Sequence, residues 1–204
     1  MPETSKTSPC TSIIDVYSDV PICPGDTSYA GLQPKGYFIR KSDIVSFPKL
    51  KGKAAASLKD IATLDGEFVL ALDKKWHLID LSEEENDFVA KPVGAYPNQL
   101  WDTEAHLVVP GTAELQTGLA ATLLNDDTVF LLPTREGKFR LFGCQNFRAK
   151  VVPELNSGKK IEDTNTTSLV VTSRDFVPAP FFTGKITTEA GDISGVDGSI
   201  IPTE

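Results

Sequence analysis

The stretch from His106 to Gly143 constrains the fold most, because strand and helix patterns follow one another in it without a long loop. A strand over His106–Val109 ends at Pro110-Gly111, a dipeptide that opens a turn. Thr112 can then cap a helix over residues 113–124. The helix has one predicted apolar face, formed by Leu115, Leu119 and Leu123 with Ala120 and Leu124 beside them. Such a face has to be buried against a sheet.

The second half of this stretch predicts a β-hairpin. Thr128–Leu132 is rich in β-branched and large apolar residues and is bounded by Pro133. The chain turns across residues 134–138 and continues as Phe139–Phe142, where Arg140 interrupts the apolar residues. We therefore expect a sheet whose end or edge is covered by the helix.

Composition favours a single β-rich domain. The chain has 204 residues, 40% of them hydrophobic and 24% charged, so it can bury roughly 70% of its unfolded surface in one core. Fourteen prolines and fifteen glycines divide it into many short segments. The predicted fold class is mainly β, a β-sandwich or barrel with one flanking α-helix. Residues 1–11 are predicted to form a flexible arm, residues 12–186 the domain and residues 187–204 a C-terminal tail.

Further strands are predicted on both sides of the central stretch. Glu67–Leu72 and Trp76–Leu81 flank the turn Asp73-Lys74-Lys75, which is a hairpin signal. Ala54–Ile61 fits either a helix or a strand, and strand is the preferred interpretation. Residues 166–173 predict a last long strand, because they are rich in β-branched side chains.

One predicted strand, over residues 99–109, has an acidic face. Side chains alternate between the two sides of a strand. One face of this strand therefore carries Leu100, Asp102, Glu104 and His106. This face therefore carries two carboxylates.

Negative charge is concentrated in the middle of the chain. Residues 59–104 hold four Lys/Arg and eleven Asp/Glu, a net charge of −7, against +2 for residues 1–58 and −3 for residues 105–204. This distribution argues against a DNA-binding protein, which needs a basic surface. It is compatible with a channel wall that repels phosphate. A solvated loop is the simpler explanation of the acidic run Glu83–Asp87.

The sequence contains no recognisable catalytic or cofactor motif. It lacks a G-x-S-x-G nucleophile elbow, a P-loop, an H-E-x-x-H motif and a Gly-rich dinucleotide turn. His77 and His106 lie in apparent strands without a close cysteine or histidine partner, which argues against a metal site. Asp102 and Glu104 could form a glycosidase pair, but such pairs are common in acidic strands. We therefore expect no enzyme activity, no cofactor and no metal.

The three cysteines, Cys10, Cys23 and Cys144, predict reduced thiols, although Cys10 and Cys23 could pair in an oxidising exterior. No apolar run approaches the roughly 20 residues that span a bilayer, and the first residues lack the apolar core of a signal peptide. We expect synthesis in the cytoplasm and no membrane insertion.

Several motifs resemble one class of viral structural proteins. These are structural proteins encoded by tailed phages and prophages of Bacteroidetes-type hosts. The C-terminal half of this chain is similar to theirs at Glu136–Gly143, Ser157-Gly158, Asp163, Ser168–Ser173 and Pro178–Phe182. The N-terminal half is similar to the same proteins at Cys23–Gly25, Gly36–Ile39 and Ser42–Val45. The resemblance implies a tail-tube-like fold, a β-sandwich or barrel with one helix, whose subunits close into hexameric rings that stack.

The resemblance also implies function, location and partners. A tail-tube subunit is a structural virion protein, made in the host cytoplasm and located in the virion tail. Its partners are copies of itself and other tail proteins, and DNA passes through the tube without specific binding. Subunits would donate edge strands to their neighbours, which removes exposed sheet edges. The candidate lumen-facing residues are Asp73 and Asp80 near the predicted hairpin, and Asp102 and Glu104 on the acidic strand.

Two alternatives stay open at this point. The same sandwich could serve as a head-decoration or head–tail completion protein of a phage, which subunit symmetry would distinguish from a tube. A surface module that binds glycans would need an exposed aromatic pair. Trp76 and Trp101 are available for this role, although core packing explains tryptophans in strands more simply.

Overall fold

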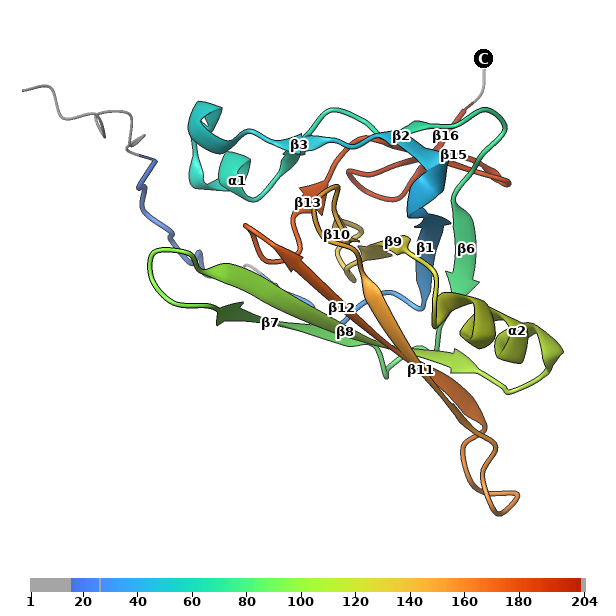
Figure 1. The fold of residues 1–204 in the computed structure, drawn as a ribbon. Helices are drawn as coiled ribbons and strands as arrows, with labels where there is room; N and C mark the ends of the chain where they lie inside the picture. The colour runs from blue at the N-terminus through green and yellow to red at the C-terminus, as the bar shows by residue number, and fades with distance from the viewer. Residues whose placement is uncertain (1–15, 26, 203–204) are drawn as a thin grey trace, which may run out of the picture.

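A computed structural model describes residues 16–25 and 27–202, which fold around a central five-stranded antiparallel sheet (Figure 1). The strand order is β13-β10-β9-β1-β6, with the bounds Phe181–Phe182, Phe139–Phe142, Thr128–Pro133, Lys35–Arg40 and His77–Asp80. All six residues of β9 are buried, because both faces of the sheet are covered. The predicted hairpin is confirmed, since β9 and β10 pair antiparallel from Phe130 opposite Phe142 to Pro133 opposite Phe139.

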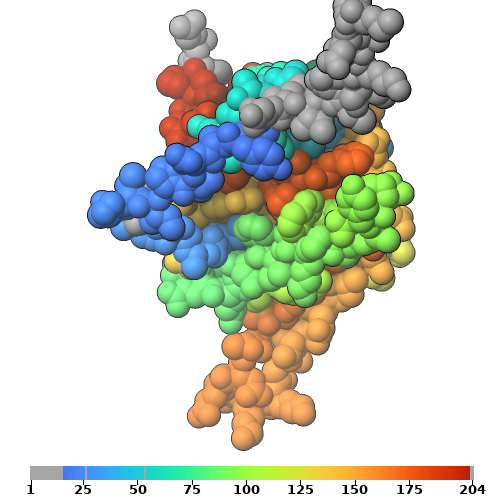
Figure 2. All heavy atoms as spheres, turned by 90° about the vertical axis from the view of Figure 1, so that its left-hand side faces the viewer, coloured from blue at the N-terminus to red at the C-terminus, as the bar shows by residue number. Residues whose placement is uncertain are grey.

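A four-stranded antiparallel sheet covers one face of the central sheet. Its order is β11-β12-β8-β7, with the bounds Lys150–Asn156, Thr166–Asp175, Leu100–Pro110 and Asp87–Val93. Alternate side chains of β8 and β12 point inward and are buried. The hairpin of β11 and β12 extends past the body of the molecule and ends in a projecting loop (Figures 1 and 2).

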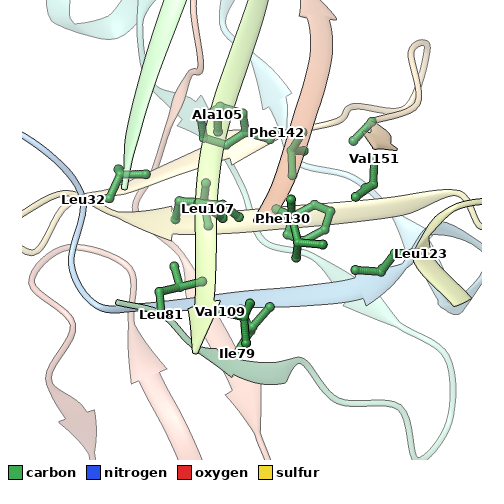
Figure 3. Packing of buried hydrophobic residues seen from close by; sticks show 14 of the residues in the cluster. Leu32, Ile79, Leu81, Ala105, Leu107, Val109, Leu123, Phe130, Phe142 and Val151 are labelled. Atoms are coloured by element: carbon green, nitrogen blue, oxygen red, sulfur yellow. The ribbon is translucent and has the colours of Figure 1, made fainter. Parts of the chain in front are cut away.

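The core between these two sheets is made of apolar side chains from both. Phe130 of β9 and Phe142 of β10 lie against Ala105 and Leu107 of β8, and Leu123 closes one end (Figure 3). The other labelled members are Leu32, Ile79, Leu81, Val109 and Val151. Each large side chain buried in this way stabilises the fold by roughly 1.5–3 kcal/mol.

Short strands cover the opposite face of the central sheet. One group is the three-stranded sheet of β14 (Lys185–Thr188), β15 (Gly191–Ser194) and β16 (Ile200–Ile201). The others are the pair of β2 (Ile44–Ser46) with β5 (Val69–Leu70) and the pair of β3 (Lys49–Leu50) with β4 (Leu64–Asp65). A second core forms here, because Val129 and Leu131 of β9 point to this side.

The prediction of a tail over residues 187–204 is wrong for residues 187–202. β14, β15 and β16 form a sheet in this region, and Ile186 and Ile193 are buried in the second core. Three glycines and short apolar segments hid these strands in the sequence. The predicted arm over residues 1–11 lies outside the described residues.

The main helix, α2, spans Glu114–Leu123, close to the predicted residues 113–124. Its N-cap residue is Ala113, whose side chain makes no capping bond. Thr112 was expected to cap the helix, but its hydroxyl donates to Asn165 Oδ1 at 2.7 Å instead. A tertiary contact has therefore replaced a local one.

The predicted apolar face of α2 is only partly buried. Ala120 and Leu123 are buried against the sheets, and Leu119 packs partly against the same core. Leu115, one turn earlier, is 79% exposed. The first half of this face is thus left without a partner in the described part of the chain.

A second helix, α1 (Leu58–Ile61), follows a 3-10 turn at Gly52–Ala54 and makes two helices instead of the one predicted. The preference for a strand over Ala54–Ile61 is therefore wrong. Ser57 caps α1, because its hydroxyl oxygen accepts from the Asp60 N–H at 3.2 Å. A second 3-10 turn, at Lys41–Asp43, joins β1 to β2.

The predicted hairpin between residues 67–72 and 76–81 is also wrong. β5 pairs with β2, whereas β6 pairs with β1 in the central sheet. The turn at Asp73, which has a positive φ of 60°, therefore joins two different sheets. Short apolar strands carry too little pattern to specify which strand they pair with.

Candidate functional site

The candidate site is the outer face of the four-stranded sheet, which is the face turned away from the central sheet. Asp102, Glu104 and His106 of β8 point to this side, while Thr103 and the alternate residues that follow are buried. The predicted division of this strand into two faces is confirmed. Register with the neighbouring strands completes the charged set of the outer face: Asp87, Lys91, Lys150, Glu154 and Arg174.

Charges of both signs are interleaved on the outer face. Arg174 Nε lies 3.3 Å from Asp102 Oδ1, and Lys91 is the residue opposite Asp102 on the other side. Lys150 lies in the same cross-strand row as Glu104, two strands away. The acidic strand predicted from β8 is therefore part of a mixed-charge surface, because its neighbours contribute cations that strand periodicity alone could not reveal.

His106 links two carboxylates on this face. Its Nδ1 lies 2.8 Å from Asp87 Oδ1, and its Nε2 lies 3.0 Å from Glu104 Oε1. The hydrogen bond to Asp87 raises the pKa of His106 most, and the bond to Glu104 raises it further, against the opposing effect of partial burial. The cluster therefore becomes less negative when the imidazole is protonated.

Both outer edges of this sheet, β7 and β11, are unpaired within residues 16–25 and 27–202. Val108 of β8 directs its backbone to the β7 side, because its N–H donates to Asn86 Oδ1 at 2.9 Å and its C=O accepts from Ser82 N at 2.7 Å. Successive residues of a strand direct their N–H and C=O groups to opposite sides of the strand. The register of β7 with β8 then turns the N–H groups of Phe88 and Ala90 to the free edge.

The same alternation identifies the free groups of β11. The Gly111 N–H donates to Asn165 O at 2.9 Å, so odd-numbered residues of β8 bond toward β12. In the observed register, the N–H groups of Val151 and Leu155 consequently point away from β12. Val151 lies beside the turn between α2 and β9, two residues after the Ala149 bridge to Thr128. The β11 edge therefore offers the Leu155 N–H as a donor to another strand.

Each edge strand contains one proline, Pro92 in β7 and Pro153 in β11. By the same alternation, both prolines place their missing N–H on the free side of the sheet. Proline is tolerated at edges because no bond within the sheet is lost. Proline also limits the pairing of other chains with these edges, because it leaves fewer N–H donors on each of them.

The four candidate lumen residues do not form one surface. Asp102 and Glu104 lie on the outer face, as described above. Asp80 is exposed at the end of β6, the edge strand of the central sheet, and Asp73 lies in the turn before β6. The expected solvated loop is exposed at Glu83–Glu85, immediately before β7.

An apolar groove of about 380 Å³ lies between α2 and the edge of the central sheet. Its lining includes Phe38 of β1, Leu78 of β6 and Leu115 and Leu119 of α2. Leu78 is 54% exposed on the border of this groove. The sequence showed the apolar stripe of the helix but not that half of it stays uncovered.

The aromatic pair that glycan binding would need is not formed by Trp76 and Trp101. Trp76 is buried in the second core, with its ring edge-on to Phe68 at 5.2 Å between centroids. Trp101 is half-buried in β8. Cys144 makes no disulfide, and burial raises the pKa of its thiol.

Metal and membrane features were also sought in the described residues. No group of three or more His, Cys, Asp or Glu side chains there is arranged to hold a metal ion. None of the helices in that part of the chain has the length and apolar character that crossing a bilayer requires. Cys10, and with it any bond between Cys10 and Cys23, lies outside the described residues.

Comparisons with known proteins identify no relative of this chain. No family model matches the chain. Neither the curated proteins nor the solved structures contain a match. The likeness to phage structural proteins therefore rests on the sequence motifs alone.

Proposed function

We propose that the protein is a structural virion subunit that self-assembles into stacked rings, forming a tail-tube-like conduit for DNA. The observation that carries this proposal is the four-stranded sheet, which has one apolar face on the core, one polar face in solvent and two edges that no described residue pairs with. A sheet of this kind is completed most directly by another copy of itself.

The strand directions allow the sheets of several copies, related by a rotation axis, to join into one closed barrel. Each strand of the sheet runs antiparallel to its neighbour, so the two edge strands, β11 and β7, run in opposite directions. When copies are related by a rotation axis, β7 of one copy meets β11 of the next in an antiparallel pair. An even number of strands thus allows a continuous antiparallel barrel.

The barrel would be wide enough to leave a lumen. Six copies, the number that the resemblance implies, would contribute about 24 strands, and barrels of roughly 16–18 strands already enclose an aqueous channel. The outer face would line this channel, with Asp102 and Glu104 among the lining residues. The buried faces would stay outside the lumen, packed on the central sheets.

Interleaved charge on this face suits passage rather than binding. Specific or non-specific DNA binding releases counterions from phosphates through a set of unpaired cations. Arg174 is paired with Asp102, and Lys91 and Lys150 are interspersed with the carboxylates of Asp87, Glu104 and Glu154. The net charge of the chain is −8. A duplex would therefore meet a wall without a basic patch and could move along it.

A substitution at the free edge tests the ring. Ala90→Pro removes an N–H that points away from the sheet, whereas Ala90→Ser keeps it. We expect the wild-type protein and Ala90→Ser to form rings or tubes in electron micrographs, and Ala90→Pro to sediment as a folded monomer. Leu155→Pro and Leu155→Thr form the matching pair on β11.

Sedimentation velocity of the wild-type protein gives the decisive control. A clean monomer at high concentration would overturn the proposal. Trimers that bind a preformed shell would support the alternative role as a head-decoration protein instead, and a single ring that does not stack would support the role in head–tail completion.

A further inference from the structure

Two exposed apolar features of the molecule have no role in the ring described above. One is the loop at the end of the β11–β12 hairpin, residues 157–165, which we call the hairpin tip. The other is the groove between α2 and the central sheet. The tip carries Ile161, whose side chain is fully exposed at the far end of the hairpin.

The hairpin tip is held in a defined conformation by its own hydrogen bonds. Asp163 Oδ2 accepts from the N–H groups of Lys159 and Lys160 at 2.8 and 2.9 Å, and Gly158 supplies a positive φ of 71°. Within the described part of the chain, neither lysine side chain forms an ion pair. The tip thus presents an apolar side chain beside two lysines, with the exposed carboxylates of Glu162 and Asp163 on its other side in sequence.

The groove offers the complementary chemistry. Its floor and walls are mainly apolar. The Asp80 carboxylate lies on its border, opposite Lys35 in the β1–β6 pairing, and forms no ion pair among the described residues. Gln116 also borders the groove, where its Nε2 donates to Pro110 O at 3.1 Å.

We propose that the hairpin tip of one copy binds in the groove of a second copy. Ile161 would enter between Leu115 and Leu78, and a lysine of the tip would pair with Asp80. This inference deepens the proposed function, on which it rests for the identity of the partner. It adds a second contact, independent of the edges of the four-stranded sheet.

The position of the tip favours a partner outside its own chain. The hairpin projects away from the body of the molecule (Figures 1 and 2), so its apolar end is presented to a neighbour. A contact between unlike surfaces of identical copies is heterologous, and it repeats into rings or stacks. Burial of one isoleucine side chain contributes about ten- to hundredfold in affinity.

Photo-crosslinking of the full-length protein tests this contact. The photoreactive amino acid p-benzoylphenylalanine replaces Leu115, and ¹⁵N-labelled and unlabelled copies are mixed so that mass spectrometry separates links between copies from links within one. We expect links from position 115 to residues 157–165 of another copy. The same amino acid in place of Leu72, an exposed residue in the turn before β6 that does not line the groove, gives the background level.

Variants of the tip decide whether the link reports the proposed contact. Ile161→Asp should lower the yield of links at least about tenfold. Lys160→Met should lower it severalfold, because it removes a donor and keeps the length of the side chain. Circular dichroism should show the wild-type fold for both, since the two side chains are exposed.

The outcomes separate this inference from the proposed function. Rings or tubes with no link between position 115 and the tip would overturn the tip contact and leave the proposed function standing. Links to the tip in a protein that forms no ring would support the tip contact and overturn the tube. Links that map to residues 1–15, or yields that Ile161→Asp leaves unchanged, would overturn the tip contact.

Discussion

The guanidinium carbon of Arg140 lies 4.0 Å from the centroid of the Phe181 ring and 4.8 Å from that of Phe88. Phe181 belongs to the central sheet and Phe88 to β7, so one side chain joins the two layers. Arg140 also donates from Nη1 to Ala179 O at 3.1 Å. Burial lowers the pKa of its guanidinium, which stays charged nevertheless.

We expect Arg140→Ala to lower the free energy of unfolding by about 2 kcal/mol, because it removes two cation–π contacts and a buried aliphatic stem. Arg140→Lys keeps the charge but not the planar group, and it should lose about half as much. Urea titration followed by tryptophan fluorescence measures both. Equal stability of the alanine variant and the wild type would show that the two layers are held by other contacts.

Stability should depend on pH through His106. Its pKa is raised in the folded protein, so its stabilising effect is complete below the unfolded pKa, near 6.5, and is lost as pH rises through the folded value. Relative to His106→Gln, the wild type should gain less than about 1 kcal/mol at acidic pH, since the group is largely solvated. Asp87→Asn should lower the pKa of His106 in an NMR titration. An unchanged titration would exclude the Asp87 bond as the main cause.

Gly195 should tolerate no side chain. A Cβ at this position would lie 2.5 Å from the Gly184 carbonyl oxygen, which accepts a hydrogen bond from the Gly195 N–H at 2.9 Å. Gly195→Ala should therefore destabilise the protein by roughly 2 kcal/mol or more by moving the strands around it. Thermal unfolding measures the loss, and its absence would contradict the packing of residues 185–201 on the second core.

Gly118 gives the matched control on α2. A Cβ at this position would meet nothing within 4 Å. Gly118→Ala should stabilise the protein by about 0.5–1 kcal/mol, because alanine has the higher helix propensity. A loss of stability in this variant, with α2 intact, would show that the exposed side of the helix is covered in solution.

Much of the local structure could be predicted because it depends on neighbours in sequence. The β9–β10 hairpin and the position of α2 follow from periodicity and turn residues in one short stretch. The division of β8 into an outward and a buried face follows from strict alternation. The cap of α1 was equally local, since Ser57 followed by Asp60 is a helix-start signal, and it was missed.

Residues 106–143 by themselves determined a strand, a helix with an apolar stripe and a hairpin, because each depends on the spacing of side chains along the chain. Only the tertiary structure decided that β6 pairs with β1 and that residues 187–202 join the core. It also decided that Leu115 stays exposed and that Lys91 and Arg174 accompany Asp102. Periodicity specifies which side chains share a face, whereas what meets that face depends on segments far away in sequence.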